Sequence, residues 1–595
     1  ITCDPAPGGP GSVQGTATAA AQVAQFFTGG EWNYRRMVLH YANLVQAAGG
    51  VEAFLIGSEF KALTRVRSGV GVYPAVDALV SLAAEVKAIV GASTLVTYAA
   101  DWTEYGADVV DAGAQEVRFP LDKLWGSPHV GAVGIDYYAP LADWRDEAGH
   151  LDRANAASTY DVAYLRGNLA SGEGFDWYYT DAAARAAQTR TPITDGLSKP
   201  WTFRVKDLWA WWANPHHERV GGVELGASSA WTPRSKPIWL TEIGCPAVDK
   251  GANQPNVFPD PKSSESFVPH FSNGARDDLI HRRYLEAVLT AFDPAFGASD
   301  TFNPVSPVYG GRMIEPSAIH LWTWDARPYP VFPAAGEVWS DAPNWQTGHW
   351  LTGRLGGAPL DALVEALAAD SGVTGIDTRD LREVCDGYVV DRPMTPRAMI
   401  EPLAQVYAFD ATAADGTLRF VQRGGAPVAE FSEDDLVDDG KGALSRLTRA
   451  QESELPREAA IGFIDALMDY RHAAVTSRRL VGGAARVLAT DLAVITNDAA
   501  AARRAEIFLQ DFWAGRERAE FSLGQRALRL SPGDVVALTQ GGRRRLFEVS
   551  DIVDTEARRI AARSIDPEVF ALPLAAPRQA AVALPAASGP PQVWL

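Results

Sequence analysis

The chain has 595 residues, too many for one hydrophobic core, so we expect two to four domains. Its composition, with 47% hydrophobic and 21% charged residues, is that of a globular protein, and no apolar run reaches the roughly 18 residues that span a bilayer. The net charge of −19 argues against direct nucleic-acid binding, which needs a basic face. Cys3, Cys245 and Cys385 form neither a disulfide framework nor a metal-ligand spacing, so we expect no metal and no cofactor.

The first part of the chain alternates short apolar runs with helical patterns. Because the chain opens without Met in what reads as a strand, we interpret it as a fragment of a longer protein. Apolar strands separated by helices indicate a parallel sheet buried on both faces, as in a (β/α)8 barrel. Six strands are predicted here, so we expect the run at 1–4 to be the third of eight and the first two to lie upstream. The predicted strands are 1–4, 51–56, 94–98, 130–136, 237–241 and 318–323, and the predicted helices are 31–47, 76–90, 203–212 and 277–292.

Tryptophan usage marks a boundary, since 16 of the 18 tryptophans lie between Trp32 and Trp350. We expect a barrel over 1–335, a linker over 336–358, two further subdomains at 359–430 and 431–572, and a Pro/Ala-rich tail at 573–595. The second part reads as α+β with antiparallel hairpins. Its predicted helices are 360–369, one starting at Thr395-Pro396, and 499–513; its predicted strands are 406–410 and 417–422, joined by an Asp415-Gly416 turn, then 526–530, 535–539 and 546–552.

Two glutamates directly follow predicted strands of the first part. Glu59 follows the run at 51–56, and Glu242 follows the run at 237–240. The carboxyl ends of parallel strands meet at one edge, and two carboxyl groups roughly 5–5.5 Å apart are the machinery of a retaining glycoside hydrolase. One such Glu alone is more often a surface or salt-bridge residue, whereas the pair favours catalysis. Burial and the charge of Glu242 should raise the pKa of Glu59, as an acid needs.

Other residues at predicted strand ends are candidates for binding a sugar, because a pyranose ring has apolar faces and a hydroxyl rim. Tyr137 or Tyr138 is placed to hydrogen-bond the nucleophile. His320, Trp322 and Trp324 alternate along the last strand and so should share one face, although ordinary packing explains the tryptophans equally well. His216-His217 has no third ligand nearby, which favours solvent-facing histidines over a metal site. The full set of candidate binding residues is Ser58, Asp101, Trp102, Tyr137, Tyr138, Trp322 and Trp324.

Several strings in this part resemble the glycoside-hydrolase TIM-barrel-like domain of gene transfer agents and related phage tail proteins. They are ITCDP at 1–5, FLIGSE at 54–59, VGIDYY at 133–138, PIWLTEIG at 237–244 and HLWTWD at 320–325. The resemblance implies that Glu59 is the acid/base and Glu242 the nucleophile. One position departs from the pattern: Ser58 stands where the related clan usually has an Asn that binds the sugar 2-hydroxyl.

The second part, over about 345–570, is similar to the tail-hub region of the same phage-like proteins. The strings are NWQTGHW at 344–350, GRLG at 353–356, GYVVD at 387–391 and LRLSPGDVV at 528–536. The resemblance implies a large tail-tip or baseplate hub protein, related to host-specificity proteins. It also implies a homotrimer within a virion that contacts other tail proteins and a cell-envelope polysaccharide or peptidoglycan.

Three functions stay open on the sequence. The chain is a tail hub carrying a working glycosidase, or the same hub with a degenerate barrel that binds sugar or acts as a spacer, or a free cellular glycoside hydrolase. The scaffold-like second part disfavours the last of these. Two carboxylates facing an open cleft would favour the first, and a loop over 248–272 that fills the cleft would favour the second.

Overall fold

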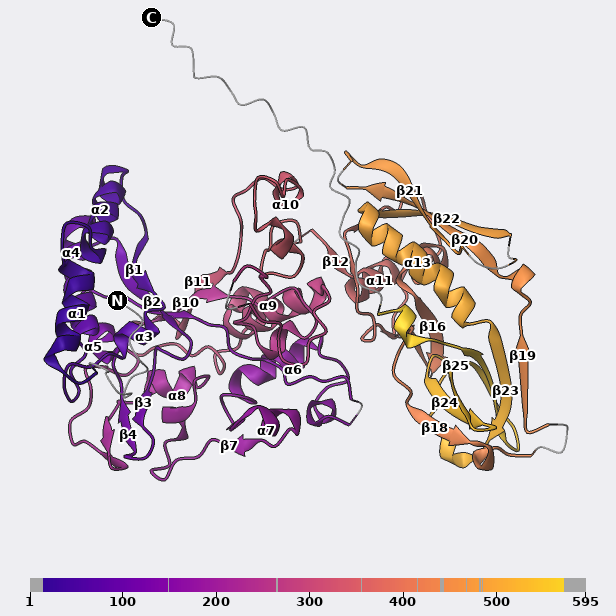
Figure 1. The fold of residues 1–595 in the computed structure, drawn as a ribbon, viewed down its shortest axis with the longest axis horizontal. Coiled ribbons are helices and arrows are strands. Elements are labelled where there is room, and N and C mark those ends of the chain that lie inside the picture. The colour runs from indigo at the N-terminus through magenta and orange to yellow at the C-terminus, as the bar shows by residue number, and fades with distance from the viewer. Residues whose placement is uncertain are drawn as a thin grey trace, which may run out of the picture. The chain divides into compact units, whose positions relative to one another are not determined.

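The computed structural model describes residues 14–147, 149–263, 266–354, 356–414, 416–438, 443–466, 468–480, 483 and 485–571. The predicted strand at 1–4, Cys3, Asp415 of the predicted turn and the predicted tail lie outside the described residues. The chain forms two compact units (Figure 1). The first unit comprises the residues up to 246 with 250–271 and 280–324, and the second comprises 247–249, 272–279 and the residues from 325 onward.

A parallel sheet forms the centre of the first unit. Its strands follow the order β1-β2-β5-β10-β11, every neighbouring pair is parallel, and each strand joins the sheet in chain order, as in an arc of a barrel. Within the described residues, β1 and β11 have a strand neighbour on one side only. The five strands confirm the predicted runs that the structure describes; they are β1 (Ala53–Ser58), β2 (Leu95–Asp101), β5 (Val133–Asp136), β10 (Ile238–Ile243) and β11 (Ile314–Leu321).

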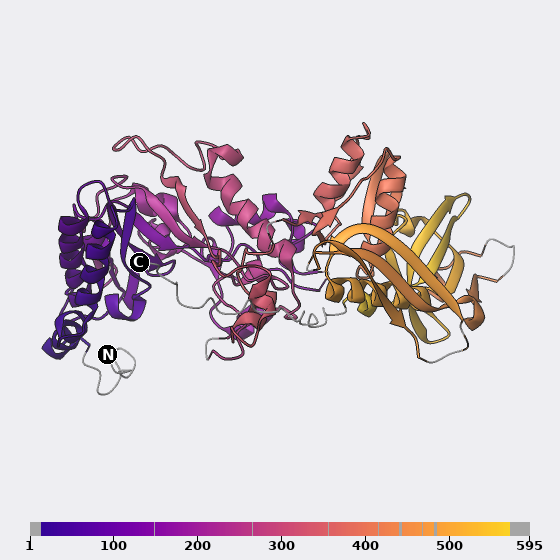
Figure 2. The ribbon, with the colours of Figure 1, turned by 90° about the horizontal axis from the view of Figure 1, so that it is seen from above.

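The helices of the first unit begin and end at the expected signals. Asn33 caps α2 by accepting a hydrogen bond from the backbone N–H of Arg36, and α4 starts with a proline and ends before Gly91, whose φ is 85°. Helices α1, α2 and α4, the indigo helices of Figure 2, pack against one another, and α4 also packs against β1 and β2. The main helices are α1 (Ala17–Thr28), α2 (Tyr34–Ala47), α4 (Pro74–Val90) and α9 (Asp278–Phe292), of which α9 continues across the boundary between the units.

Two predictions for this unit were wrong in extent. The helix predicted over 203–212 is a 3-10 turn, Pro200–Phe203, followed by α8 (Leu208–Ala213), which Asp207 caps. The last strand ends at Leu321, so Trp322 and Trp324 lie beyond it and do not share a strand face. Shorter elements are α3 (Lys61–Thr64), α5 (Asp122–Trp125), α6 (Val162–Gly167), α7 (Ala182–Ala186), β3 (Asp108–Asp111), β4 (Glu116–Arg118), β6 (Trp177–Tyr178), β7 (Thr191–Pro192), β8 (Arg219–Val220) and β9 (Val223–Glu224).

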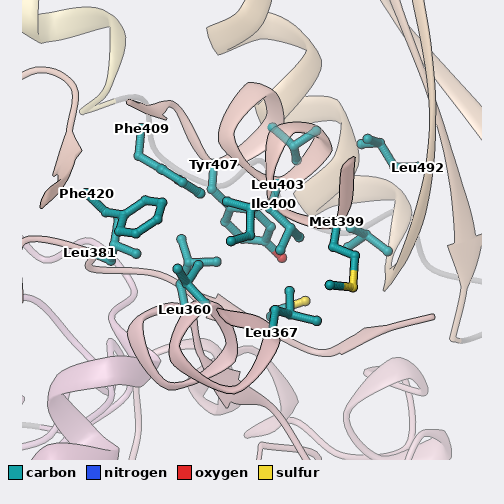
Figure 3. Packing of buried hydrophobic residues seen from close by; sticks show 14 of the residues in the cluster. Leu360, Leu367, Leu381, Met399, Ile400, Leu403, Tyr407, Phe409, Phe420 and Leu492 are labelled. Atoms are coloured by element: carbon teal, nitrogen blue, oxygen red, sulfur yellow. The ribbon is translucent and has the colours of Figure 1, made fainter. Parts of the chain in front are cut away.

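One hydrophobic core joins the helices and strands at the start of the second unit (Figure 3). Leu360, Leu403, Phe409 and Phe420 are fully or almost fully buried in it. As predicted, Thr395 caps α12 through its side chain, and α11 matches the predicted range. The elements here are α10 (Val331–Ala334), β12 (Ala358–Pro359), α11 (Leu360–Ala369), β13 (Ile376–Asp377), β14 (Val384–Cys385), β15 (Gly387–Tyr388), α12 (Pro396–Tyr407), β16 (Phe409–Ala414) and β17 (Thr417–Gln422).

Two further sheets complete the second unit. One has the order β15-β22-β20-β21 and carries α13 against β20 and β21; the other has the order β18-β24-β25-β26-β23-β19. Strands β20 to β22 were not predicted, and the strand predicted over 526–530 is wrong, because a 3-10 turn (Gln525–Ala527) begins there. The elements are β18 (Ala429–Ser432), β19 (Ser445–Arg449), β20 (Pro456–Asp465), β21 (Arg471–Arg478), β22 (Arg486–Thr496), α13 (Asp498–Ala514), β23 (Glu517–Leu523), β24 (Val535–Gln540), β25 (Arg543–Asp554) and β26 (Arg558–Ser564).

The fold class is therefore a parallel, TIM-barrel-like α/β sheet followed by a mixed, β-rich α+β region, as the sequence predicted. In the part of the chain that the structure describes, no helix combines the length and the apolar character that a bilayer crossing requires.

Candidate active site

Acidic residues gather at the carboxyl ends of the central strands of the first unit. Asp101 of β2 pairs in register with Asp136 of β5, which pairs in turn with Glu242 of β10. Glu59 follows directly after β1, and its backbone N–H donates to the carbonyl of Ala99 on β2 at 2.8 Å. Parallel pairing thus brings four acidic residues from four strands to one edge of the sheet.

Asp136 lies at the centre of this cluster and is fully buried. The Ser58 hydroxyl donates to one of its carboxylate oxygens at 3.0 Å, and the Thr241 hydroxyl donates to the other at 2.7 Å. Because Ser58 precedes Glu59 and Thr241 precedes Glu242, Asp136 connects the two segments that carry the candidate catalytic glutamates. Burial, first, and then repulsion by Glu242 raise the pKa of Asp136 to about 7, although the two hydroxyls oppose the shift.

The Glu242 carboxylate accepts a hydrogen bond from a tyrosine hydroxyl. The Tyr138 hydroxyl, almost fully buried, donates to its Oε2 atom at 2.7 Å. The pKa of Glu242 is raised above its ordinary value: burial raises it most, the hydrogen bond from Tyr138 opposes the shift, and the charge of Glu59 adds to it. The charge of Glu59 therefore acts on Glu242, and the hydrogen bond from Tyr138 favours the ionised form that a nucleophile needs, against the effect of burial.

Glu59 differs from Glu242 in both backbone and surroundings. Its φ is 52°, in the left-handed region that a non-glycine residue adopts at a cost of about 1–3 kcal/mol. Although its side chain is exposed, its pKa is raised to about 7, first by desolvation and then by repulsion from Asp136, Asp101 and Glu104. The direction of the shift is the one predicted, but the main charge responsible belongs to Asp136 rather than to Glu242.

The other predicted site residues fall into different surroundings. Asp101 forms an ion pair of 3.3 Å with Lys61. Tyr137 is fully buried, and burial, first, and then the charge of Asp207 raise its pKa. The Tyr138 hydroxyl, not that of Tyr137, reaches the Glu242 carboxylate, whereas the backbone N–H of Tyr137 donates to the Glu242 carbonyl at 2.7 Å. Trp102 is half-buried beside a groove described below, whereas Trp322 and Trp324 are exposed by 44% and 64% beyond β11.

The expectation for His216 was wrong. This residue is fully buried, its Nδ1 lies 2.8 Å from Asp122 and its Nε2 lies 2.8 Å from the carbonyl of Trp211. It thus contacts one oxygen of the buried carboxylate of Asp122, the first residue of α5. No group of His, Cys, Asp or Glu residues in the described ranges has the arrangement of a metal site.

Sequence reasoning missed the function of Asp136 and Thr241. Asp136 is the last residue of the strand predicted over 130–136, but a single sequence does not show which strand ends become neighbours. A signal was nevertheless present: both glutamates follow a hydroxyl residue, Ser58 or Thr241. Ser58 uses its hydroxyl on Asp136, so this position, where the clan usually has a sugar-binding Asn, holds the cluster together instead.

Comparison with family models found two matches. The model described as "GTA TIM-barrel-like domain" matches residues 32–333, just over half of the chain, and the model described as "Putative phage tail protein" matches residues 395–552. A comparison with curated proteins found no significant match.

Solved structures give similar but partial matches. A chain of a native gene transfer agent virion is 27% identical, with a TM-score of 0.37, over 42% of this chain and 56% of that chain. A prophage tail protein from Shewanella oneidensis is 16% identical, with a TM-score of 0.26, over 37% of this chain and 65% of that one. A GH113 β-mannanase from Alicyclobacillus acidocaldarius is 18% identical, with a TM-score of 0.23, over 54% of this chain and 57% of that one. The chain thus spans less than two thirds of the length of each of these proteins. On the family match, it belongs to the family of the gene transfer agent (GTA) TIM-barrel-like domain, here joined to a region that matches phage tail proteins.

Proposed function

We propose that this chain is a component of the tail tip of a phage-like particle and that its first unit is a retaining glycoside hydrolase acting on a cell-envelope glycan. The observation that carries the enzymatic part is the asymmetry of the two glutamates. Burial raises the pKa of both glutamates, but Glu242 receives a hydrogen bond from Tyr138 that favours its ionised form, whereas the pKa of Glu59 is raised to about 7, which keeps a proton available. Pairs of carboxyl groups with different environments are the mark of acid/base and nucleophile roles.

In the proposed reaction, the Glu242 carboxylate attacks the anomeric carbon while Glu59 gives its proton to the departing glycosidic oxygen. The bond from the anomeric carbon to that oxygen breaks, and a glycosyl ester with Glu242 forms. Glu59, now ionised, takes a proton from a water molecule, whose oxygen attacks the anomeric carbon and releases Glu242. Asp136 acts as a positioning residue, because it fixes the segments before both glutamates.

The tail-protein match of the second unit supports a place in an assembly. There we propose contacts with other tail proteins within a homotrimeric hub that reaches envelope polysaccharide or peptidoglycan during host attachment or DNA delivery. A binding-only barrel is the second candidate, and one observation favours it. The Ser58 hydroxyl is engaged with Asp136, and a serine reaches less far than the Asn that holds the sugar 2-hydroxyl in the clan.

The decisive experiment compares Glu242→Gln and Glu59→Gln with the wild-type chain on purified envelope polysaccharide and peptidoglycan. Glu85→Gln on α4 is the matched control, since Glu85 is an exposed partner of Arg35. We expect release of reducing sugar by the wild type and the control, and loss of about 10²-fold or more in the other two. Unchanged release by Glu242→Gln would remove its role as nucleophile. Retained glycan binding without release by any form would establish the binding module.

A further inference from the structure

A groove of about 980 Å³ lies in the first unit, outside the cluster of acidic residues. Its walls come from the segment after β2, from the segment at 174–205 that follows β5, and from residues near α8 and β8. Neither Glu59, Asp136, Tyr138 nor Glu242 lines it. The segments after β2 and β5 leave the same edge of the sheet at which the acidic residues gather, and Trp102, the first residue after β2, directly follows Asp101.

Aromatic side chains form much of the groove wall. Tyr105 and Trp211 pack edge to face, with ring centroids 5.0 Å apart, and both are almost fully buried, whereas Trp102, Trp201 and Phe203 are half-buried. Flat apolar surfaces of this kind bind ligands that have apolar faces of similar size. The aromatic lining residues are Trp102, Tyr105, Tyr178, Trp201, Phe203 and Trp211.

A buried donor without a partner points to a ligand with acceptor groups. The indole N–H of Trp211 has no hydrogen-bond partner among the described residues, although Trp211 is only 2% exposed. A Cβ atom added at Gly106, another lining residue, would lie 3.6 Å from this nitrogen. An unsatisfied buried donor costs about 1–3 kcal/mol, which a ligand oxygen would recover.

The charged residues of the groove already neutralise one another. Arg219 forms two hydrogen bonds with Asp195, at 2.8 and 3.1 Å, and Arg65 lies 3.2 Å from Asp108. Arg204 pairs with Asp207 at 3.6 Å. With each arginine of the lining paired to a carboxylate, the groove favours an uncharged ligand over a phosphate or a carboxylate.

We infer that this groove binds an uncharged stretch of glycan chain and holds it next to the acidic cluster. Sugar rings supply apolar faces for the tryptophans and hydroxyl oxygens for the Trp211 N–H. The inference rests on the proposed function, because the bound glycan would extend from the groove toward Glu59 and Glu242. It assigns to the groove a binding task that is separate from bond cleavage, so the two are separable by experiment.

The test uses the full chain carrying Glu242→Gln, so that binding is measured without hydrolysis. Calorimetry follows titration with β-1,4-linked hexasaccharides of N-acetylglucosamine, mannose and glucose, up to about 1 mM. We expect one of them to bind, and Trp102→Ala to weaken its binding at least about tenfold. Gly106→Ala should also weaken binding, because its methyl group contacts the Trp211 nitrogen at an ordinary van der Waals distance that leaves the fold intact. The control is Trp32→Ala, since Trp32 is 82% exposed and outside the groove.

Absence of binding by all three sugars, or binding that both groove variants leave unchanged, would overturn the inference. A proline-rich decapeptide provides a further arm, because aromatic grooves also bind such peptides. Binding of the peptide without any hexasaccharide would likewise overturn it. Hydrolysis tested separately on the wild-type chain reports on the glutamates, so an inactive chain that still binds a hexasaccharide in the groove would refute the enzyme and retain the glycan site.

Discussion

Replacing Asp136 by Asn should stabilise the first unit at neutral and alkaline pH. The folded chain holds Asp136 fully buried with a pKa of about 7, against an ordinary value of 3.8. A carboxyl group with a raised folded pKa binds its proton more tightly in the folded state, so its contribution to stability falls as the pH rises from about 4 to about 7. At about 1.4 kcal/mol per pH unit, the charge costs up to about 4 kcal/mol above pH 7.

The amide of the Asp136→Asn variant would carry no charge at any pH, but the hydrogen bonds from the Ser58 and Thr241 hydroxyls would weaken. The amide group cannot accept both hydrogen bonds, and a hydroxyl left without its acceptor costs about 2 kcal/mol, so the net gain at pH 8 should be about 1–2 kcal/mol. At pH 4, where the folded Asp136 is protonated, the gain is absent and the variant should be the less stable protein. For a unit of this size, 1–2 kcal/mol corresponds to an increase in Tm of about 2–8 °C.

Denaturant unfolding of both proteins at several pH values, followed by tryptophan fluorescence, measures this difference. Thr395→Ala is a suitable reference, because it removes a helix cap in the second unit and its effect of about 1 kcal/mol should not vary with pH. A stability difference between Asp136→Asn and the wild type that stays constant from pH 4 to pH 8 would refute the idea that Asp136 carries a buried charge.

Three further predictions concern single side chains. Tyr138→Phe removes the hydrogen bond to Glu242 and should raise the pKa of Glu242, so the acidic limb of the pH–activity profile should move to higher pH and kcat/KM should fall about 10–100-fold. An acidic limb that does not move would contradict this. Lys206→Met should stabilise the chain below pH 7 and less so toward pH 10, because the fully buried ammonium group has a pKa lowered to about 7 and stability rises as it loses its proton. Equal effects at pH 6 and pH 10 in thermal unfolding would exclude that explanation. Phe409→Ala, in the core of the second unit, should lower the free energy of unfolding measured with denaturant by about 3–5 kcal/mol and leave sugar binding by the first unit unchanged. A decrease of less than about 1 kcal/mol would show that the core is not closely packed there.

The local elements could be predicted because their signals are contained in a few neighbouring residues. Thr395 and the following proline fix the start of α12, and the apolar runs before Glu59 and Glu242 form the predicted strands. Strands β20 to β22 were missed because their pattern becomes meaningful only when they pair with one another and with α13.

The sequence by itself determined that Glu59 and Glu242 each lie at the carboxyl end of a strand, because each comes after an apolar run of the kind that a buried parallel strand requires. Only the tertiary structure decided that Asp136 would stand between them, that the hydroxyl of Tyr138 rather than that of Tyr137 would reach the Glu242 carboxylate, and that Ser58 would bind a carboxylate. The physical reason is that the pKa of a carboxyl group and the partner of a hydroxyl depend on atoms within a few ångströms, and those atoms come from strands far apart in the chain.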